Sequence, residues 1–395
     1  MHADPEQFIE EIGKTFPDQK EGVRNFLYTC KKIKEDAEKL GISGNPTIIQ
    51  KLKVMVKYPT IMKFARKKYS QMLDYFISHE EVKRMFYLYC SWFGQAPYEL
   101  SAAAGAVLTA IGQFDGIYYP KGGTMQFSKK LSKYYEMCGG KLRLNSTVRK
   151  INVENRTAIG IELDDGSSIN GTFIISNADL KRTMLDYVGA AHLNESFINY
   201  IKNLKQSPSG ISLFLGVNKD LSQYPAHMTT GRKADDIPKV RDQNIFELDT
   251  IVLRILTRID PTINPPNLNS IVIYYMAPYN SNNKWKTGPN EERTEEYVKL
   301  KDKICEDIIS MAERLIPNLR KDIKIKELAT PITYSKYSFS TEGAWHGPSM
   351  INKKLPHFKT PIKNLLLAGG NMVGGGVPRV MQSGFKTADY ILNNI

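Results

Sequence analysis

The spacing of apolar residues divides the chain into a helical part and later parts that mix strands with helices. From about Asp4 to Ala110, apolar residues recur every three or four positions, as they do along one face of a helix. Gly41 and the prolines at positions 46, 59 and 97 separate these stretches. The pattern predicts a helical region over residues 1–115.

Shorter patterns follow over residues 116–180. Gly122-Gly123 leads into a predicted helix that Gly139-Gly140 ends, because glycine readily forms a C-terminal helix cap. Runs rich in apolar and β-branched residues predict four strands, of which the first three form a small antiparallel meander; they are 141–144, 147–153, 158–163 and 172–176. The run Phe173-Ile174-Ile175 has no polar alternation, which is typical of a strand buried on both faces of a parallel sheet.

Residues 181–345 are predicted to form a separate sheet with helical cover. Three strand-like stretches lie within 209–221, 247–261 and 269–280, and two of them are rich in β-branched and aromatic residues. A long amphipathic helix is predicted over 294–319. We predict that this region is an α+β domain inserted between the two parts of an α/β domain, so the fold class is α/β with an α+β insertion.

The closing residues 346–395 contain a short apolar strand, two glycine-rich turns and a helix. Asn364–Ala368 suits a central parallel strand, and Gly369 with Gly370 lets bare backbone approach a ligand. A second cluster, Gly374–Gly376, precedes a helix with its predicted apolar stripe at Val380, Gly384, Ala388 and Ile391. The free N–H groups at the helix start favour a phosphate or an electron-rich ring carbonyl. The alternative is a structural turn before a C-terminal helix.

Composition narrows the class of protein. The formal charge of +13 favours acidic partners or an anionic membrane surface. The four cysteines form no CxxC pair, so we predict neither a metal site nor a disulfide framework. The N-terminal residues lack an apolar signal region and no run of about 18 apolar residues occurs, which predicts a cytoplasmic protein, either free or at a membrane surface. No nucleic-acid-binding motif is present, so no nucleic-acid partner is expected.

Basic residues between Lys31 and Lys68 lie beside apolar ones and allow two interpretations. The stretch contains Met55, Val56, Ile61, Met62 and Phe64. A helix that lies on a membrane surface has this composition. We favour the simpler interpretation, a solvated lysine-rich face over an apolar core stripe.

Two stretches resemble the flavin-dependent phytoene desaturase and retinol saturase group of the amine-oxidase-like superfamily. They are YPKGGTMQFSKKLSKYYEMCGGKLRLNSTVRKI with the following SNADL, and the closing NLLLAGGNMVGGGVPRVMQSGFKTADYILNNI. SGISLFLGVNKDL and ELATPITYSKYSFSTEGAWHG, which lie between them, resemble a strand of that group's substrate domain and the segment before its flavin strand. The resemblance therefore covers nearly all of the chain.

The resemblance implies an FAD enzyme that oxidises or saturates carbon–carbon bonds of a long apolar polyene or isoprenoid-like lipid by hydride transfer. It places Val148 near the adenine end of FAD. It places a second set of residues along the ribityl chain and the flavin ring: Gly369, Gly370, Asn371, Gly375, Gly376, Val377, Pro378 and Met381. It also implies a Rossmann-like FAD-binding domain made of 116–180 and 346–395, and a substrate domain at 181–345.

The chain departs from this family in one large respect. Members begin with a strand, a GxGxxG turn and a helix that hold the pyrophosphate, and this sequence contains no GxGxxG. We therefore expect an incomplete Rossmann-like domain and weak or no FAD binding by these residues alone. Three explanations stay open: an N-terminally truncated copy, which we favour; a partner polypeptide that supplies the missing half; and a remnant that binds a membrane or lipid without catalysis.

The sequence assigns no catalytic residue. Flavin chemistry is carried by the cofactor and requires no acid–base pair from the protein. His346 in GAWHG is the one histidine that the resemblance places near the flavin, and Trp345 beside it would form a wall of the ring site. A structural role for His346 is the simpler interpretation, and core packing is the simpler role for Tyr274 and Tyr275.

Overall fold

A computed structural model describes most of the chain in two units. The described residues are 4–40, 57–91, 95–229, 251–264, 266–279, 283–349, 352, 354–373 and 375–394. Described residues up to Tyr119 belong to the first unit, and those from Pro120 onward belong to the second. Residues 41–56 of the region predicted to be helical, and Gly374 of the second glycine cluster, lie outside the described residues.

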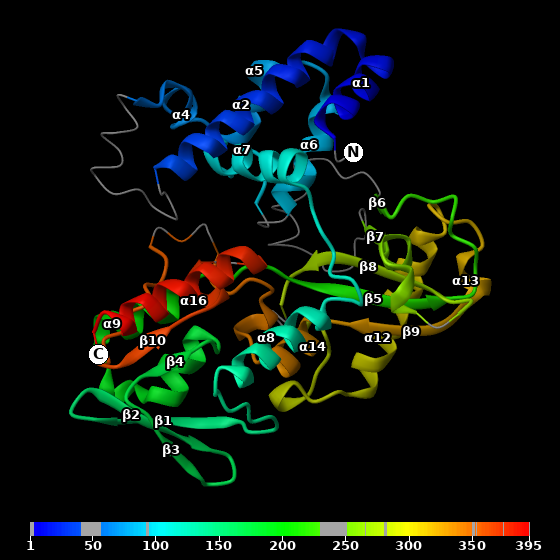
Figure 1. Cartoon of the computed structure of the whole chain (residues 1–395). Helices are drawn as coiled ribbons and strands as arrows, with labels where there is room; N and C mark the ends of the chain where they lie inside the picture. The colour runs from blue at the N-terminus through cyan, green and yellow to red at the C-terminus, as the bar shows by residue number, and fades with distance from the viewer. Residues whose placement is uncertain are drawn as a thin grey trace. The chain divides into compact units, whose positions relative to one another are not determined.

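The first unit is helical, as the apolar spacing predicts. Its elements are α1 (Pro5–Thr15), η1 (Pro17–Gln19), α2 (Lys20–Lys39), α4 (Pro59–Phe64), α5 (Tyr69–Phe76), α6 (Glu80–Ser91), α7 (Ala102–Ala110) and η2 (Ile111–Asp115), drawn in blue to cyan in Figure 1. Helix α2 buries one apolar stripe, and its Phe26 ring lies 4.8 Å from the ring of Phe86. The ring of Tyr69, on α5, packs directly on Gly105 of α7. The helices of this unit therefore share one core.

The basic stretch beside this core is partly described by the structure. Ile61 and Phe64 of α4 are buried, whereas Met62 is exposed, so the apolar residues of this short helix mainly serve the core. Among the described residues, no helix is long and apolar enough to cross a membrane.

The second unit begins with α8 (Met125–Met137) and a three-stranded antiparallel meander. The meander consists of β1 (Val148–Glu154), β2 (Thr157–Leu163) and β3 (Ser168–Asn170), in that order. The prediction of a strand over 141–144 is wrong: those residues are exposed and form no strand. The third strand is β3 instead. All three of its residues are exposed, so its sequence does not show the apolar pattern that marks a buried strand.

A pair of parallel strands follows from segments far apart in the sequence. β4 (Ile174–Ser176) pairs in parallel with β10 (Leu365–Leu367), and Leu365 lies opposite Ile174. All three residues of β10 are buried. The prediction that 173–175 is buried on both faces is wrong for Ile175, whose side chain is 49% exposed.

The inserted region forms a five-stranded antiparallel sheet with helical cover. Its strand order is β6 (His227–Thr229), β7 (Val252–Ile255), β8 (Asn269–Ala277), β5 (Ser209–Val217) and β9 (Ile323–Ala329). Helix α12 (Glu295–Ala312) shares a core with the sheet, to which Ile308, Ile273 and Leu213 contribute. The α/β class with an inserted sheet and helix is therefore confirmed.

The remaining elements connect these sheets and close the chain. They are η3 (Arg182–Gly189), η4 (Ala190–His192), α9 (Glu195–Asn203), α11 (Leu256–Ile259), η5 (Pro261–Ile263), η7 (Pro289–Glu291), α13 (Leu319–Asp322), α14 (Pro331–Ser338), η8 (Thr341–Gly343), α15 (Gly370–Val373) and α16 (Val377–Leu392). The predicted buried stripe of the last helix is wrong, because α16 buries Ser383 and Thr387 instead.

Candidate functional site

The carboxyl ends of β4 and β10 lie side by side. The N–H of Ala368, just after β10, donates to the carbonyl of Ser176 at the end of β4 over 2.9 Å. Parallel strands bring their carboxyl ends to the same edge of a sheet, and ligands of open α/β folds bind at that edge. The candidate site is therefore the turn that follows β10.

Hydrogen bonds from α16 fix the start of this turn. The N–H of Gly369 donates to Ser383 Oγ over 2.7 Å, and Thr387 Oγ1 donates to the carbonyl of Leu367 over 2.9 Å. Both side chains are buried, so these bonds replace water for the polar groups at the end of the strand. Gly369 itself has φ +88° and lies against the side chain of Asn177.

Two glycines of the site present bare backbone to open space. A Cβ atom built on Gly370 or Gly376 would meet no atom within 4 Å. Gly376 has φ +104° and precedes the first turn of α16, where no side chain caps the helix. A ligand can therefore approach the backbone at both positions, next to helix N–H groups that favour negative charge.

Gly375 has a different environment. A Cβ atom at this position would lie 1.9 Å from Nδ1 of His346, so the glycine allows the histidine ring to pack against the turn. The backbone N–H of His346 donates to Ser207 Oγ over 2.9 Å. The predicted neighbourhood of His346 and the closing turn is therefore present in the structure.

Asn371 braces the turn from within α15. Its Nδ2 donates to the carbonyl of Ala178 over 2.7 Å, and its Oδ1 accepts from the N–H of Leu180 over 3.3 Å. Both partners belong to the segment that follows β4. The amide therefore holds the two sides of the site together, a role that the sequence did not indicate.

The other residues predicted to contact a cofactor lie on two elements. Val377, Pro378 and Met381 form the exposed first part of α16, directly after the open glycines. Val148 is half-buried at the start of β1, in the three-stranded meander, and lies opposite Leu163. The structure thus groups Gly369 to Met381 around one turn and places Val148 on another sheet.

An aromatic cluster adjoins His346 in the sequence. The ring centroid of Trp345 lies 5.7 Å from that of Tyr334 and 6.3 Å from that of Tyr274. Tyr334 donates from its hydroxyl to Ser212 Oγ over 2.7 Å. The sequence alone indicated Trp345 and Tyr274, but it missed Tyr334, because a tyrosine near a proline and several serines carries no distinctive signal.

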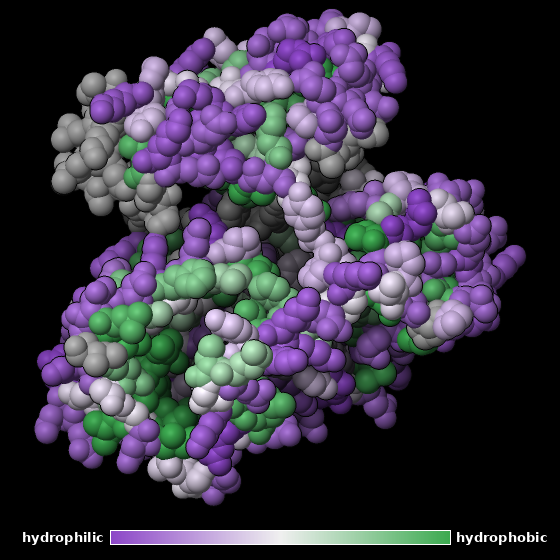
Figure 2. Space-filling view, viewed as in Figure 1, coloured by the Kyte–Doolittle hydropathy of each residue, from purple (hydrophilic) through white to green (hydrophobic). Residues whose placement is uncertain are grey.

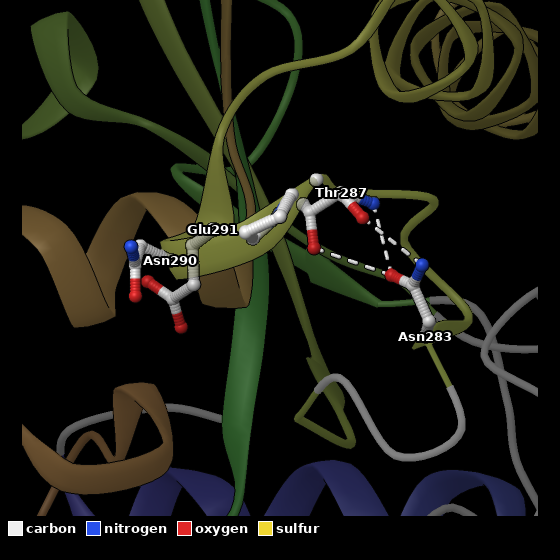
Figure 3. Close-up of a pocket in the computed structure, with 6 residues that line it drawn as sticks. Asn283, Thr287, Asn290 and Glu291 are labelled. Carbon is white, nitrogen blue, oxygen red and sulfur yellow. Dashed lines mark hydrogen bonds between the residues drawn. The ribbon is translucent and has the colours of Figure 1, made fainter.

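A polar hollow lies elsewhere in the second unit, on the loop 283–291. Figure 3 shows that Asn290 and Glu291 point away from the pair formed by Asn283 and Thr287. Asn283 Oδ1 accepts from the N–H of Thr287 over 2.9 Å, so the loop is closed by its own hydrogen bonds. Most of the lining residues carry polar side chains, including the carboxylate of Glu291, which suits a lipid-like ligand poorly.

The partly buried position of His346 predicts a pH effect. Burial lowers the pKa of this histidine, whereas an unfolded histidine has a pKa of about 6.5. As the pH falls through 6.5, the unfolded chain binds a proton that the folded chain does not bind, so folding becomes less favourable. We expect the free energy of unfolding of the natural chain to fall more steeply between pH 7.5 and 5.5 than that of His346→Gln, measured by urea denaturation. Parallel pH profiles would contradict this prediction.

Comparison with known proteins agrees with this arrangement. The model of the family described as flavin containing amine oxidoreductase matches residues 13–392. The chain is 25% identical over 411 residues to a lycopene-forming phytoene desaturase from a Paracoccus species, a match that covers 99% of the chain and 77% of that protein. It is 27% identical over 331 residues to 4,4'-diaponeurosporene oxygenase from Staphylococcus aureus, which covers 81% of the chain and 64% of that protein. The chain thus spans less than two thirds of the staphylococcal protein.

Solved structures show the same fold. An oxidoreductase from Methanosarcina mazei superposes with a TM-score of 0.57 at 17% identity, over 87% of this chain and 73% of that chain. A putrescine oxidase variant superposes with a TM-score of 0.56 at 10% identity, over 95% of this chain and 76% of that chain. With the family match over nearly its whole length, the chain belongs to the flavin-containing amine oxidoreductases.

Proposed function

We propose that the chain is an FAD-dependent oxidoreductase that acts on carbon–carbon bonds of a long apolar, polyene or isoprenoid-like substrate. The observation that carries the proposal is the open backbone at Gly370 and Gly376, at the carboxyl end of the parallel strand pair. In this proposal residues 116–180 and 346–395 form the FAD-binding domain, 181–345 form the substrate domain, and 1–115 form a helical region that faces substrate or membrane.

The turn after β10 offers open backbone and helix N–H groups, which suit a flavin and the negative charge that develops on it during reduction. Residues that would hold the group are Gly369, Gly370, Asn371, Gly375, Gly376, Val377, Pro378 and Met381, with Val148 assigned to the adenine end. The uncapped start of α16 would face the flavin edge on which negative charge develops during reduction. Bound FAD supplies the hydride-accepting or hydride-donating chemistry.

The protein's own contribution would be to orient the substrate and exclude water. Trp345, Tyr334 and Tyr274 provide a connected aromatic surface, and Trp345 precedes His346 at the glycine turn. Such a surface offers apolar area against which a flat, apolar chain can pack. The names of the Paracoccus and Staphylococcus relatives, a phytoene desaturase and a diaponeurosporene oxygenase, support this substrate class.

The Gly370→Val variant tests where the flavin lies. Gly370 has an ordinary φ and open space around it, so valine should fold normally yet occupy the ligand's place. We expect FAD to bind at least about tenfold more weakly to the variant than to the natural chain, a difference of about 1.4 kcal/mol. Flavin fluorescence titration measures this even when binding is weak.

Gly384→Val provides the matched control. Gly384 lies on α16, where an added Cβ atom would also meet no atom within 4 Å, but it is outside the turn. We expect the flavin affinity of this variant to match that of the natural chain. Equal affinities for the natural chain and Gly370→Val would contradict the proposed position of the flavin.

A further inference from the structure

The two faces of the inserted sheet differ in chemistry. Leu253, Ile273 and Leu213 share a core with α12 on one face. Successive residues of a strand point to opposite faces, so Arg254 of β7 and Tyr274 of β8 lie on the other face. Figure 2 shows that hydrophilic side chains dominate the visible surface of the inserted region around α13, whereas this second face of the sheet carries aromatic rings beside an arginine.

The guanidinium of Arg254 lies over an aromatic ring. Its Cζ is 5.1 Å from the ring centroid of Tyr274, and that centroid is 6.3 Å from the ring centroid of Trp345. The residue after Trp345 is His346, whose ring packs against the glycine turn at Gly375. A series of contacts therefore connects Arg254 to the candidate flavin site.

Arg254 lacks a protein partner in the part of the chain that the structure describes. Its Nε is buried there without a hydrogen-bond partner. No carboxylate of the described residues forms an ion pair with the guanidinium, and His227, which lies opposite Arg254 on β6, supplies no negative charge. Burying a donor without a partner is unfavourable, so a bound group that accepts from Arg254 would stabilise this face of the sheet.

The chemistry of the guanidinium indicates which group would bind. A guanidinium is planar and pairs with a carboxylate through two parallel hydrogen bonds. It balances a single negative charge, whereas a phosphate monoester carries about 1.5 to 2 negative charges and would need a second cation. The rings of Tyr274 and Trp345 offer a surface on which an apolar chain attached to the carboxylate can pack.

We propose that Arg254 binds a carboxylate at one end of the substrate, and that the apolar chain of the substrate extends along Tyr274 and Trp345 toward the glycine turn. Arg254 is then a specificity-determining residue. This inference rests on the proposed function and narrows its substrate class to long, unsaturated carboxylic acids. Anchoring one end of such a chain also fixes which carbon–carbon bond reaches the flavin.

The test measures binding of a polyene acid to the full 395-residue chain in the absence of flavin. The probe is cis-parinaric acid, a conjugated tetraene with one carboxyl group whose fluorescence rises in apolar surroundings, and its methyl ester is the uncharged control. Titrations are made at about pH 8, where the free carboxyl group is ionised. We expect the acid to bind at least about tenfold more tightly than the ester, because only the acid pairs with the guanidinium.

Variants assign the preference to one side chain. Arg254→Gln should lower the affinity for the acid at least about tenfold, to that for the ester, and leave the affinity for the ester unchanged. Arg254→Lys keeps the charge without the planar fork and should retain part of the preference. Arg143→Gln, which removes an exposed arginine before β1, is the matched control for net charge and should bind both probes like the natural chain.

The ratio of the two affinities separates recognition from a structural role of Arg254. A variant that is merely destabilised would lose acid and ester binding together, and Tyr274→Leu should do so because both probes pack on that ring. Equal binding of acid and ester by the natural chain, a preference that survives in Arg254→Gln, or no saturable binding of the acid would overturn the inference.

A separate flavin titration distinguishes this inference from the proposed function. We expect Arg254→Gln to bind FAD like the natural chain, because Arg254 lies on the inserted sheet and outside the glycine turn. Flavin binding without a preference for the acid would overturn only the carboxylate site. A preference for the acid without flavin binding would count against the proposed function and would support the site at Arg254.

Discussion

Gly369→Ala is expected to lower the free energy of unfolding of the second unit by about 2 to 5 kcal/mol. Gly369 has φ +88°, and a left-handed backbone costs a residue with a side chain about 1 to 2 kcal/mol. The added Cβ would also lie 1.6 Å from Oδ1 of Asn177, and such overpacking costs about 1 to 3 kcal/mol. Urea denaturation followed by circular dichroism measures the change.

Gly370→Ala is the matched control at the next position. Its backbone has an ordinary φ, and the new methyl group would meet no atom within 4 Å. We therefore expect its stability to lie within about 1 kcal/mol of that of the natural chain. Equal stability of Gly369→Ala and Gly370→Ala would contradict the geometry described for the turn, in which Asn177 lies against Gly369 and open space lies beside Gly370.

Long elements with a strong local pattern were predictable from the sequence. The strands β5 and β8 and the helix α12 each extend over nine residues or more, and each lies within the stretch predicted for it. The glycine turn after β10 was also predictable, because clustered glycines directly after a buried apolar strand favour a tight turn with accessible backbone. Local composition was sufficient in these cases because each stretch is long and rich in residues typical of its element.

Short elements failed where neighbours, rather than local sequence, decide burial. Ile175 belongs to an apolar run, yet it is 49% exposed, and its exposure depends on which other elements cover the faces of the sheet. α16 buries Ser383 and Thr387 because hydroxyl groups are needed at the end of β10, and apolar residues cannot supply them. The role of Asn371 as a brace depends on a segment more than 190 residues earlier in the chain, so no local pattern could reveal it.

Gly210→Ala is expected to destabilise the second unit by about 2 to 4 kcal/mol and to move Trp345. Gly210 lies on β5, and a Cβ there would lie 2.1 Å from the Trp345 ring and 2.6 Å from the carbonyl oxygen of Tyr275. The carbonyl belongs to the paired strand β8 and has little freedom, so the strain falls near the upper end of overpacking costs. Urea denaturation and tryptophan fluorescence measure the two effects.

Gly216→Ala on the same strand separates this effect from a general cost of alanine in β5. Its Cβ would lie 3.2 Å from the nearest atom, in the side chain of Ile325 on the edge strand β9, which can move slightly. We expect little change in stability or fluorescence for this variant. A normal Gly210→Ala protein would mean that Trp345 is not held by β5. Because Trp345 also contacts Tyr334 and precedes His346 at the glycine turn, a displaced ring would connect the inserted sheet to the candidate flavin site.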